Sequence, residues 1–180
     1  LKILEQQFEI VFHARNKADL DEVCRLKKED SDLHGILASF GVMVPVSVLA
    51  NFINELRDEH GLYTFAIGYD PWHILGGDRE LLEQMVGQDR CEQVSQGAKT
   101  LSDPMYRIRA DYQQGRFVDD AHPINRWCRM NVMAIYDSNM NILPDKKEAK
   151  GANKIDGFMA ELDGYIALLK HEAEYKSLIS

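Results

Sequence analysis

The sequence predicts an α/β domain with a mixed sheet and helices on both faces. Segments rich in β-branched and aromatic residues alternate along the chain with amphipathic segments of helical period. The run YTFAIGYD at 63–70 is mostly apolar and lacks clean alternation, which is typical of a central strand covered on both faces. The length of 180 residues suits one domain with its own core, and we expect residues 1–180 to form it.

The elements follow in order from these patterns. Strands are predicted at 8–14, 36–44, 63–70, 91–95, 116–118 and 132–136. Helices are predicted at 17–30, 48–59, 79–86, 103–114, 123–131 and 155–175. Ser47 is expected to cap the second helix and Gly61 to end it. The least structure is expected at 71–78, 96–102 and 144–154.

Composition narrows the class of protein. Hydrophobic residues make up 45% and charged residues 28%, as in soluble globular proteins. No apolar run reaches the ~20 residues of a membrane span, so no membrane partner is expected. Cys24, Cys91 and Cys128 are far apart, which favours reduced, mostly buried thiols in a cytosolic protein. The net charge of −8 weighs against a basic DNA-coating module, but carboxylates that hold divalent cations would also make the chain acidic.

Asp70 ends the predicted strand at 63–70, in the sequence GYDPW. Open α/β sheets place ligands at the carboxyl ends of their strands, and Pro71 stops the strand directly after the carboxylate. The alternative is that Asp70 caps a turn, because Asp-Pro is common in turns. The sequence leaves both roles open.

The segment KIDGFMAELDGYIALL at 154–169 predicts a helix with one apolar stripe and three acids. Asp156 and Asp163 lie seven residues apart, on nearly the same bearing at one edge of the stripe and about 10 Å apart along the axis. Either could be a metal ligand, a solvated side chain or, for Asp156, a charge favoured by the helix dipole. Glu161 lies at the opposite edge and is expected to be solvated.

The segment DSNMN at 137–141 has acids and amides at the spacing of a calcium loop. Ile142 stands where an EF-hand needs glycine, however. We therefore expect a β-turn between two short strands. Six cations between 126 and 154 form a local excess in this acidic chain and could contact a phosphate backbone or simply be solvated.

Five short motifs, in one order, resemble the C-terminal nuclease domain of bacteriophage terminase large subunits. The resemblance covers roughly residues 45–170. The motifs are GYDPW (68–72), SQGAKTLSDPM (95–105), HPINRWCRMNV (122–132), PDKKEAK (144–150, after a DxNxN turn) and KIDGFMAEL (154–162).

This resemblance implies an RNase H-like mixed sheet flanked by helices on both faces. It also implies a metal-dependent endonuclease that cuts concatemeric double-stranded DNA with two Mg²⁺ or Mn²⁺ ions during genome packaging. Carried over by position, Asp70 and Asp156 are catalytic metal ligands, and Asp163 is a reserve candidate. Among the cations, Lys146, Lys147, Lys150 and Lys154 are the candidate DNA contacts. The implied partners are DNA, the terminase small subunit and the portal, in the cytoplasm of the bacterial host.

Two departures from the family keep an alternative open. The ATPase domain with its P-loop is absent from these residues, so we do not expect this chain to translocate DNA by itself. The family also carries an acid on its first strand, where this chain has only Glu9; that strand lies before Leu1, or Glu9 or Asp163 substitutes. The alternative function is a catalytically weak module that holds DNA or docks on the portal. A third reading is an unrelated α/β enzyme.

Overall fold

A computed structural model describes residues 10–14, 36–40, 46–72, 74, 76–117, 123–146 and 154–179; for 10–14, 36–40, 124, 146 and 179 it describes the backbone alone. Its strands are β1 (Ile10–Ala14), β2 (Ile36–Phe40), β3 (Ile67–Tyr69), β4 (Cys91–Gln93), β5 (Val132–Tyr136) and β6 (Ile142–Lys146). Its helices are α2 (Val46–His60), α3 (Gly76–Val86), α4 (Ala98–Gln113), α5 (Pro123–Met130), α6 (Asp156–Lys170) and α7 (Glu172–Ile179), with a 3₁₀ turn η3 (Gln88–Arg90).

The strands pair into three separate two-stranded sheets. β1 pairs with β2 and β3 with β4, both in parallel, and β5 pairs with β6 antiparallel. The parallel strands β3 and β4 are joined through α3, which confirms the α/β class. The described residues do not join these pairs into the single mixed sheet that the sequence predicts. The predicted helix at 17–30 lies outside the described residues.

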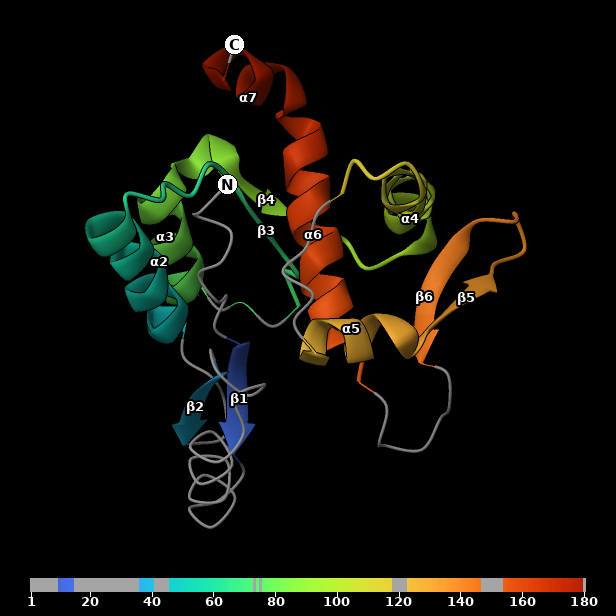
Figure 1. Ribbon diagram of the computed structural model, residues 1–180, viewed down its shortest axis with the longest axis horizontal. Coiled ribbons are helices and arrows are strands. Elements are labelled where there is room, and N and C mark those ends of the chain that lie inside the picture. Colours follow the sequence, from blue (N-terminus) through green and yellow to red (C-terminus); the bar gives the residue numbers. More distant parts are fainter. Residues whose placement is uncertain are drawn as a thin grey trace.

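Helix α6 is the centre of the molecule (Figure 1). It contacts β3 on one side and α4 on another, and α5 packs across its first turns. Helices α2 and α3 contact each other beyond β3. Because α6 has protein on several sides, polar residues at the edges of its apolar stripe can also be buried.

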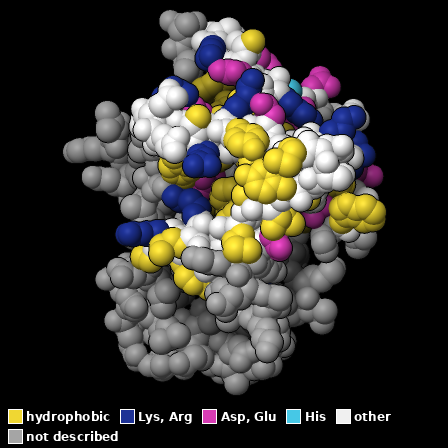
Figure 2. Space-filling view, turned by 90° about the vertical axis from the view of Figure 1, so that its right-hand side faces the viewer, with side chains coloured by type: hydrophobic (Ala, Val, Ile, Leu, Met, Phe, Trp, Pro, Cys, Tyr) yellow, Lys and Arg dark blue, Asp and Glu magenta, His cyan; other side chains and the backbone are white. Residues whose placement is uncertain are grey.

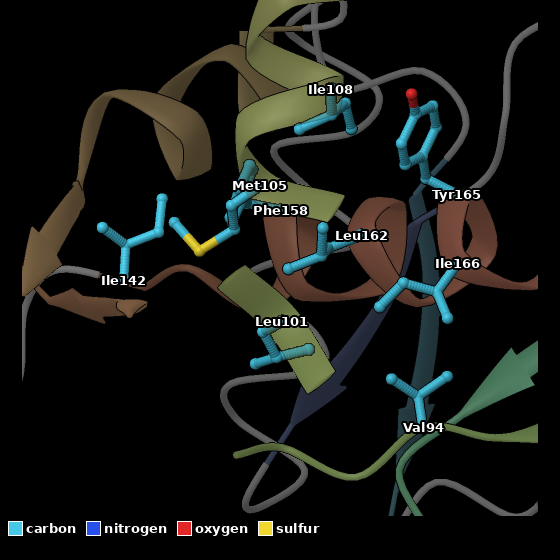
Figure 3. Packing of buried hydrophobic residues seen from close by; sticks show 9 residues of the cluster. All are labelled: Val94, Leu101, Met105, Ile108, Ile142, Phe158, Leu162, Tyr165 and Ile166. Atoms are coloured by element: carbon cyan, nitrogen blue, oxygen red, sulfur yellow. The ribbon is translucent and has the colours of Figure 1, made fainter. Parts of the chain in front are cut away.

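The hydrophobic core fills the space between α6 and α4 (Figure 3). Leu101 and Leu162 are almost fully buried there. Ile142 of β6 joins the same cluster, and its backbone N–H donates to the hydroxyl of buried Ser102 at 3.1 Å. The cluster consists of Val94, Leu101, Met105, Ile108, Ile142, Phe158, Leu162, Tyr165 and Ile166. It confirms the predicted apolar stripe of the last helix.

Several predicted boundaries were wrong. Helix α4 begins at Ala98 and contains Pro104, whereas the sequence predicts a helix only from residue 103. Leu101, Met105 and Ile108 are all buried at helical spacing, so packing against α6 extends the helix through the proline. Helix α3 begins at Gly76, and α2 begins at Val46, so that Ser47 lies inside it rather than capping it.

The other differences are shorter strands and one divided helix. β3 and β4 are three residues each, and residues 116 and 117 form no strand. The last helix divides at His171 into α6 and α7. Gly61 ends α2 as predicted, at φ 65°, and its N–H donates to the carbonyl of Arg57. Cys91 and Cys128 are free thiols, half-buried and buried, while Cys24 lies outside the described residues.

The turn at 137–141 joins β5 to β6 in a hairpin, as predicted. Asp137 organises the turn, because its side chain accepts from the backbone N–H groups of Asn139 (2.8 Å) and Asn141 (2.9 Å). The hairpin exposes several large apolar side chains: Met133, Ile135, Tyr136 and Met140. Figure 2 looks onto the side from which the hairpin projects and shows hydrophobic side chains gathered on that face. In the part of the chain that the structure describes, no helix has the length and hydropathy of a membrane span.

Candidate functional site

The backbone of β3 lies directly against α6. A Cβ atom added to Gly68 would sit 2.0 Å from the carbonyl oxygen of Asp163, so only glycine allows this approach. The end of β4 is held beside the end of β3, since the N–H of Val94 donates to the carbonyl of Tyr69 at 2.8 Å. Asp70 therefore leaves the strand at a fixed place beside the helix.

Asp70 begins a tight turn beyond β3. Its Oδ1 accepts the backbone N–H of Trp72 at 3.0 Å, across Pro71. This confirms the turn-capping role that the sequence left open. A carboxylate has two oxygens and several lone pairs, so capping and metal binding are compatible.

Asp163 is buried, with 7% of its surface exposed. The side-chain amide of Gln96 donates to its carboxylate, with Nε2 at 3.1 Å from Oδ1 and 3.4 Å from Oδ2. Burial raises the pKa of Asp163 to about 6, and the negative charge of Asp70 adds to the rise while the Gln96 hydrogen bond opposes it. The structure thus brings Asp70 and Asp163 together, close enough for their charges to repel.

Asp156 is exposed in the first turn of α6. It lies about 10 Å before Asp163 along the helix axis. In Figure 1, β3 runs alongside α6 towards the end at which α5 packs, which is the end that carries Asp156. Gly68 lies beside Asp163, so Asp70, about 6–7 Å further along the strand, lies at a level between the two acids of the helix.

The expectation that Glu161 is solvated was wrong. Its Oε1 accepts the hydroxyl of Tyr112 at 2.6 Å, and its Oε2 lies 3.1 Å from Nε of Arg129. The guanidinium of Arg129 also lies over the Tyr112 ring, 5.4 Å from its centroid. These contacts join α6 to α4 and α5, so Glu161 holds the three helices together on the side of α6 that α4 and α5 cover.

The four candidate DNA-binding lysines lie between the last residue of β6 and the start of α6. Lys154 is exposed, and its carbonyl accepts the side-chain amide of Asn131 at 3.1 Å. Lys146 ends β6, with only its backbone described. Lys147 and Lys150 lie outside the described residues.

The donor set at Asp70 and Asp163 suits a hard divalent cation. Carboxylate oxygens are the ligands that Mg²⁺ and Mn²⁺ prefer. A cation placed there would also offset the repulsion from Asp70, which adds to the effect of burial on the pKa of Asp163. Within the described ranges no three His, Cys, Asp or Glu side chains converge on one metal position. The pair therefore fits part of a metal site.

Sequence reasoning missed Gln96. It follows the strand β4 in the motif SQG, and the only available signal was that motif and its place after a strand end. Gly68 was a second unused signal, because glycine inside a strand marks a close backbone approach.

A separate pocket of about 600 Å³ lies between α4, α6 and α7, and Asp70, Asp163 and Gln96 do not line it.

Three comparisons with known proteins show what this chain is similar to. The family described as "Terminase large subunit, endonuclease domain" matches residues 21–172. The structure is similar to the crystal structure of the HK97 bacteriophage large terminase, with a TM-score of 0.64 and 19% identity, over 86% of this chain and 32% of that chain. Protein YmfN of Escherichia coli (strain K12) is 32% identical over 93 residues, which are 51% of this chain and 19% of that protein. The chain thus spans about a third or less of these relatives.

Proposed function

Because this chain belongs to the terminase large subunit family and matches its endonuclease domain, we propose that it is a metal-dependent endonuclease. Its substrate in this proposal is concatemeric double-stranded DNA, cut during phage genome packaging. The observation that supports it most is the buried Asp163 carboxylate beside Asp70 at the end of β3. Two acids held together without a neutralising cation are unfavourable in an ordinary fold, and they are common where a cation binds.

The proposed cofactor is Mg²⁺ or Mn²⁺ in a two-metal site. Bound divalent ions would supply a water activated at neutral pH and stabilisation of the leaving oxygen. The chain's own part is to hold the carboxylates in place beside the rigid β3–α6 contact. No nucleophilic side chain is required, which agrees with the absence of nucleophile motifs from the sequence.

Asp70 is the ligand common to every version of this site. The resemblance pairs it with Asp156, and the geometry pairs it with Asp163, so we propose Asp70 with these two acids of α6 as its candidate partners. Asp163 ranks first on burial and on its electrostatic coupling to Asp70. A further ligand on the first strand of an RNase H-like sheet belongs to the same proposal. Glu9, one residue before β1, lies outside the described residues.

The partners and location follow from the family and remain proposals. They are DNA, the terminase small subunit and the portal, in the cytoplasm of the bacterial host. Lys146, Lys147, Lys150 and Lys154 are the proposed contacts to the DNA backbone.

The test is plasmid cleavage with Mn²⁺ or Mg²⁺ by the wild type and by Asp70→Asn, Asp156→Asn and Asp163→Asn. We expect Asp70→Asn to abolish cleavage while DNA binding persists, because a neutral amide is a weaker ligand for the cation. The stronger loss among the two helix variants identifies the partner of Asp70. Asp89→Asn, at an exposed acid of η3, is the matched control and should cleave like the wild type.

A wild type that cleaves equally well after all three substitutions contradicts the site. A wild type that binds DNA and never cleaves favours the second candidate, a module that holds DNA or docks on the portal. The exposed apolar side chains of the β5–β6 hairpin, among them Tyr136 and Met140, favour that candidate, because large exposed apolar patches mark interaction surfaces.

A further inference from the structure

We propose that Gln96 is a positioning residue for metal binding: its side-chain amide orients the Asp163 carboxylate towards Asp70. This inference rests on the proposed function, since it treats Asp163 as a metal ligand. Gln96 itself is not proposed to touch the metal or the DNA.

The hydrogen bonds of Gln96 define the orientation of its amide. Nε2 lies 3.0 Å from the carbonyl oxygen of Val94 and 3.1 Å from Oδ1 of Asp163. An amide nitrogen carries two hydrogens, so one is directed to each acceptor. Both acceptors require the nitrogen, and not the amide oxygen, at this place. The Gln96 amide is therefore fixed, and it presents a donor to the carboxylate.

The backbone behind Gln96 is equally well fixed. Val94 is fully buried in the core cluster, and its N–H donates to the carbonyl of Tyr69 at 2.8 Å. Tyr69 immediately precedes Asp70. The same short segment thus sets the position of Asp70 through the backbone and that of Asp163 through the Gln96 side chain.

The bond also resists the repulsion within the acid pair. The carboxylate of Asp163 has little solvent around it, and Asp70 repels it. Without the Gln96 donor, the side chain could turn away from Asp70, and it would then bind a cation less well. Residues that hydrogen-bond to metal ligands typically change metal affinity 10–100-fold when they are replaced.

The experiment measures Mn²⁺ affinity, by electron paramagnetic resonance of free Mn²⁺, in wild type, Gln96→Leu, Asp163→Asn and the double variant. We expect Gln96→Leu to weaken Mn²⁺ binding about 10–100-fold. We expect it to have little further effect in the Asp163→Asn background, because the residue acts only through Asp163. Gln93→Leu, at an exposed glutamine of β4, is the matched control and should bind like the wild type.

Gln96→Asn is the second variant should the leucine variant fail to fold, as judged by circular dichroism. It keeps the amide but shortens the side chain by one methylene, so it should also lose affinity. Wild-type affinity in a folded Gln96 variant, with weakened binding in Asp163→Asn, overturns the positioning role and leaves the proposed function intact. Losses of Mn²⁺ affinity from Gln96→Leu and Asp163→Asn that add up in the double variant also overturn the positioning role. A wild type that binds no Mn²⁺ contradicts the proposed function itself.

Discussion

Asp163 is an acid whose burial makes its charged form unfavourable in the folded protein. Its pKa rises to about 6 from the ordinary value of 3.8. Since the folded state then binds the proton more tightly than the unfolded state, the free energy of unfolding falls as pH rises from about 4 to about 6. Above that range the full penalty, on the order of 3 kcal/mol for two pKa units, persists in metal-free protein.

We therefore expect Asp163→Asn to be more stable than the wild type in EDTA above pH 6, and the difference to shrink as pH falls towards 4. The measurement is urea unfolding of both proteins from pH 4 to pH 8. Asp89→Asn, at an exposed acid, should show no such pH-dependent difference. A difference for Asp163→Asn that stays constant with pH would mean that its carboxylate titrates normally in the folded protein.

Individual residues of the site show what can and what cannot be predicted from sequence patterns. The position of Asp70 at the end of a strand could be predicted, because an apolar strand precedes it and Pro71 follows it. The resemblance put Asp156 first and kept Asp163 as a reserve candidate. Helical period shows which face of the helix is apolar, but not which element covers the edge of that face. The edge is covered here by β3, which approaches through Gly68. The Gln96 hydrogen bond spans 67 positions in the chain and has no local signal.

At the scale of elements, α6 connects the site to the core. Its buried stripe packs against α4, Asp163 faces β3, and Glu161 binds Tyr112 and Arg129. Loss of one partner from a partly buried ion pair of this kind destabilises the protein. The helix therefore has polar contacts on two edges as well as the apolar contact, and its position relative to β3 is strongly determined.

The contact of β3 with α6 can be tested by Gly68→Ala. The added Cβ would lie 2.0 Å from the carbonyl oxygen of Asp163, so strand and helix must separate. We expect a loss of about 1–3 kcal/mol in the free energy of unfolding, as for overpacked cores. Weaker Mn²⁺ binding should accompany it, because Asp70 and Asp163 move apart.

The matched control for this test is Gly164→Ala on the same helix, where no atom lies within 4 Å of the added Cβ. Alanine there should be neutral or stabilising by about 0.5–1 kcal/mol, as expected inside a helix. Both variants are measured by urea unfolding and by Mn²⁺ titration. If Gly68→Ala were as stable as the wild type, the close approach of strand and helix would be wrong.

At the scale of the whole molecule, the sequence predicted the kinds of element better than their assembly. The hairpin, the buried stripe of α6 and the α/β class follow from local patterns and are confirmed. The division into three sheets depends on pairings between distant segments, such as Ile67 with Cys91, for which a single sequence holds little information. Pro104 lies inside α4, although proline usually interrupts a helix. Core packing overrides the local sequence signal there.

The charge of the whole molecule leads to the last prediction. A chain of net charge −8 repels DNA overall, so binding requires a local group of cations. We expect replacement of Lys146, Lys147, Lys150 and Lys154 by Gln to weaken binding to double-stranded DNA of any sequence. Each lost phosphate contact should also reduce the slope of log K against log salt concentration by about 0.9. The measurement is fluorescence anisotropy at several salt concentrations, with Ca²⁺ in place of Mg²⁺.

The matched control removes the same total charge by replacing four exposed cations. Each of them pairs with an acid on its own helix. These are Arg57 (with Asp58), Arg79 (with Glu83), Arg107 (with Asp103) and Lys176 (with Glu172). Equal loss of affinity and slope in both quadruple variants would show that only net charge matters. A selective loss in the lysine variant places the DNA along the segment between β6 and α6, which leads directly to Asp156 and the start of the helix that carries Asp163.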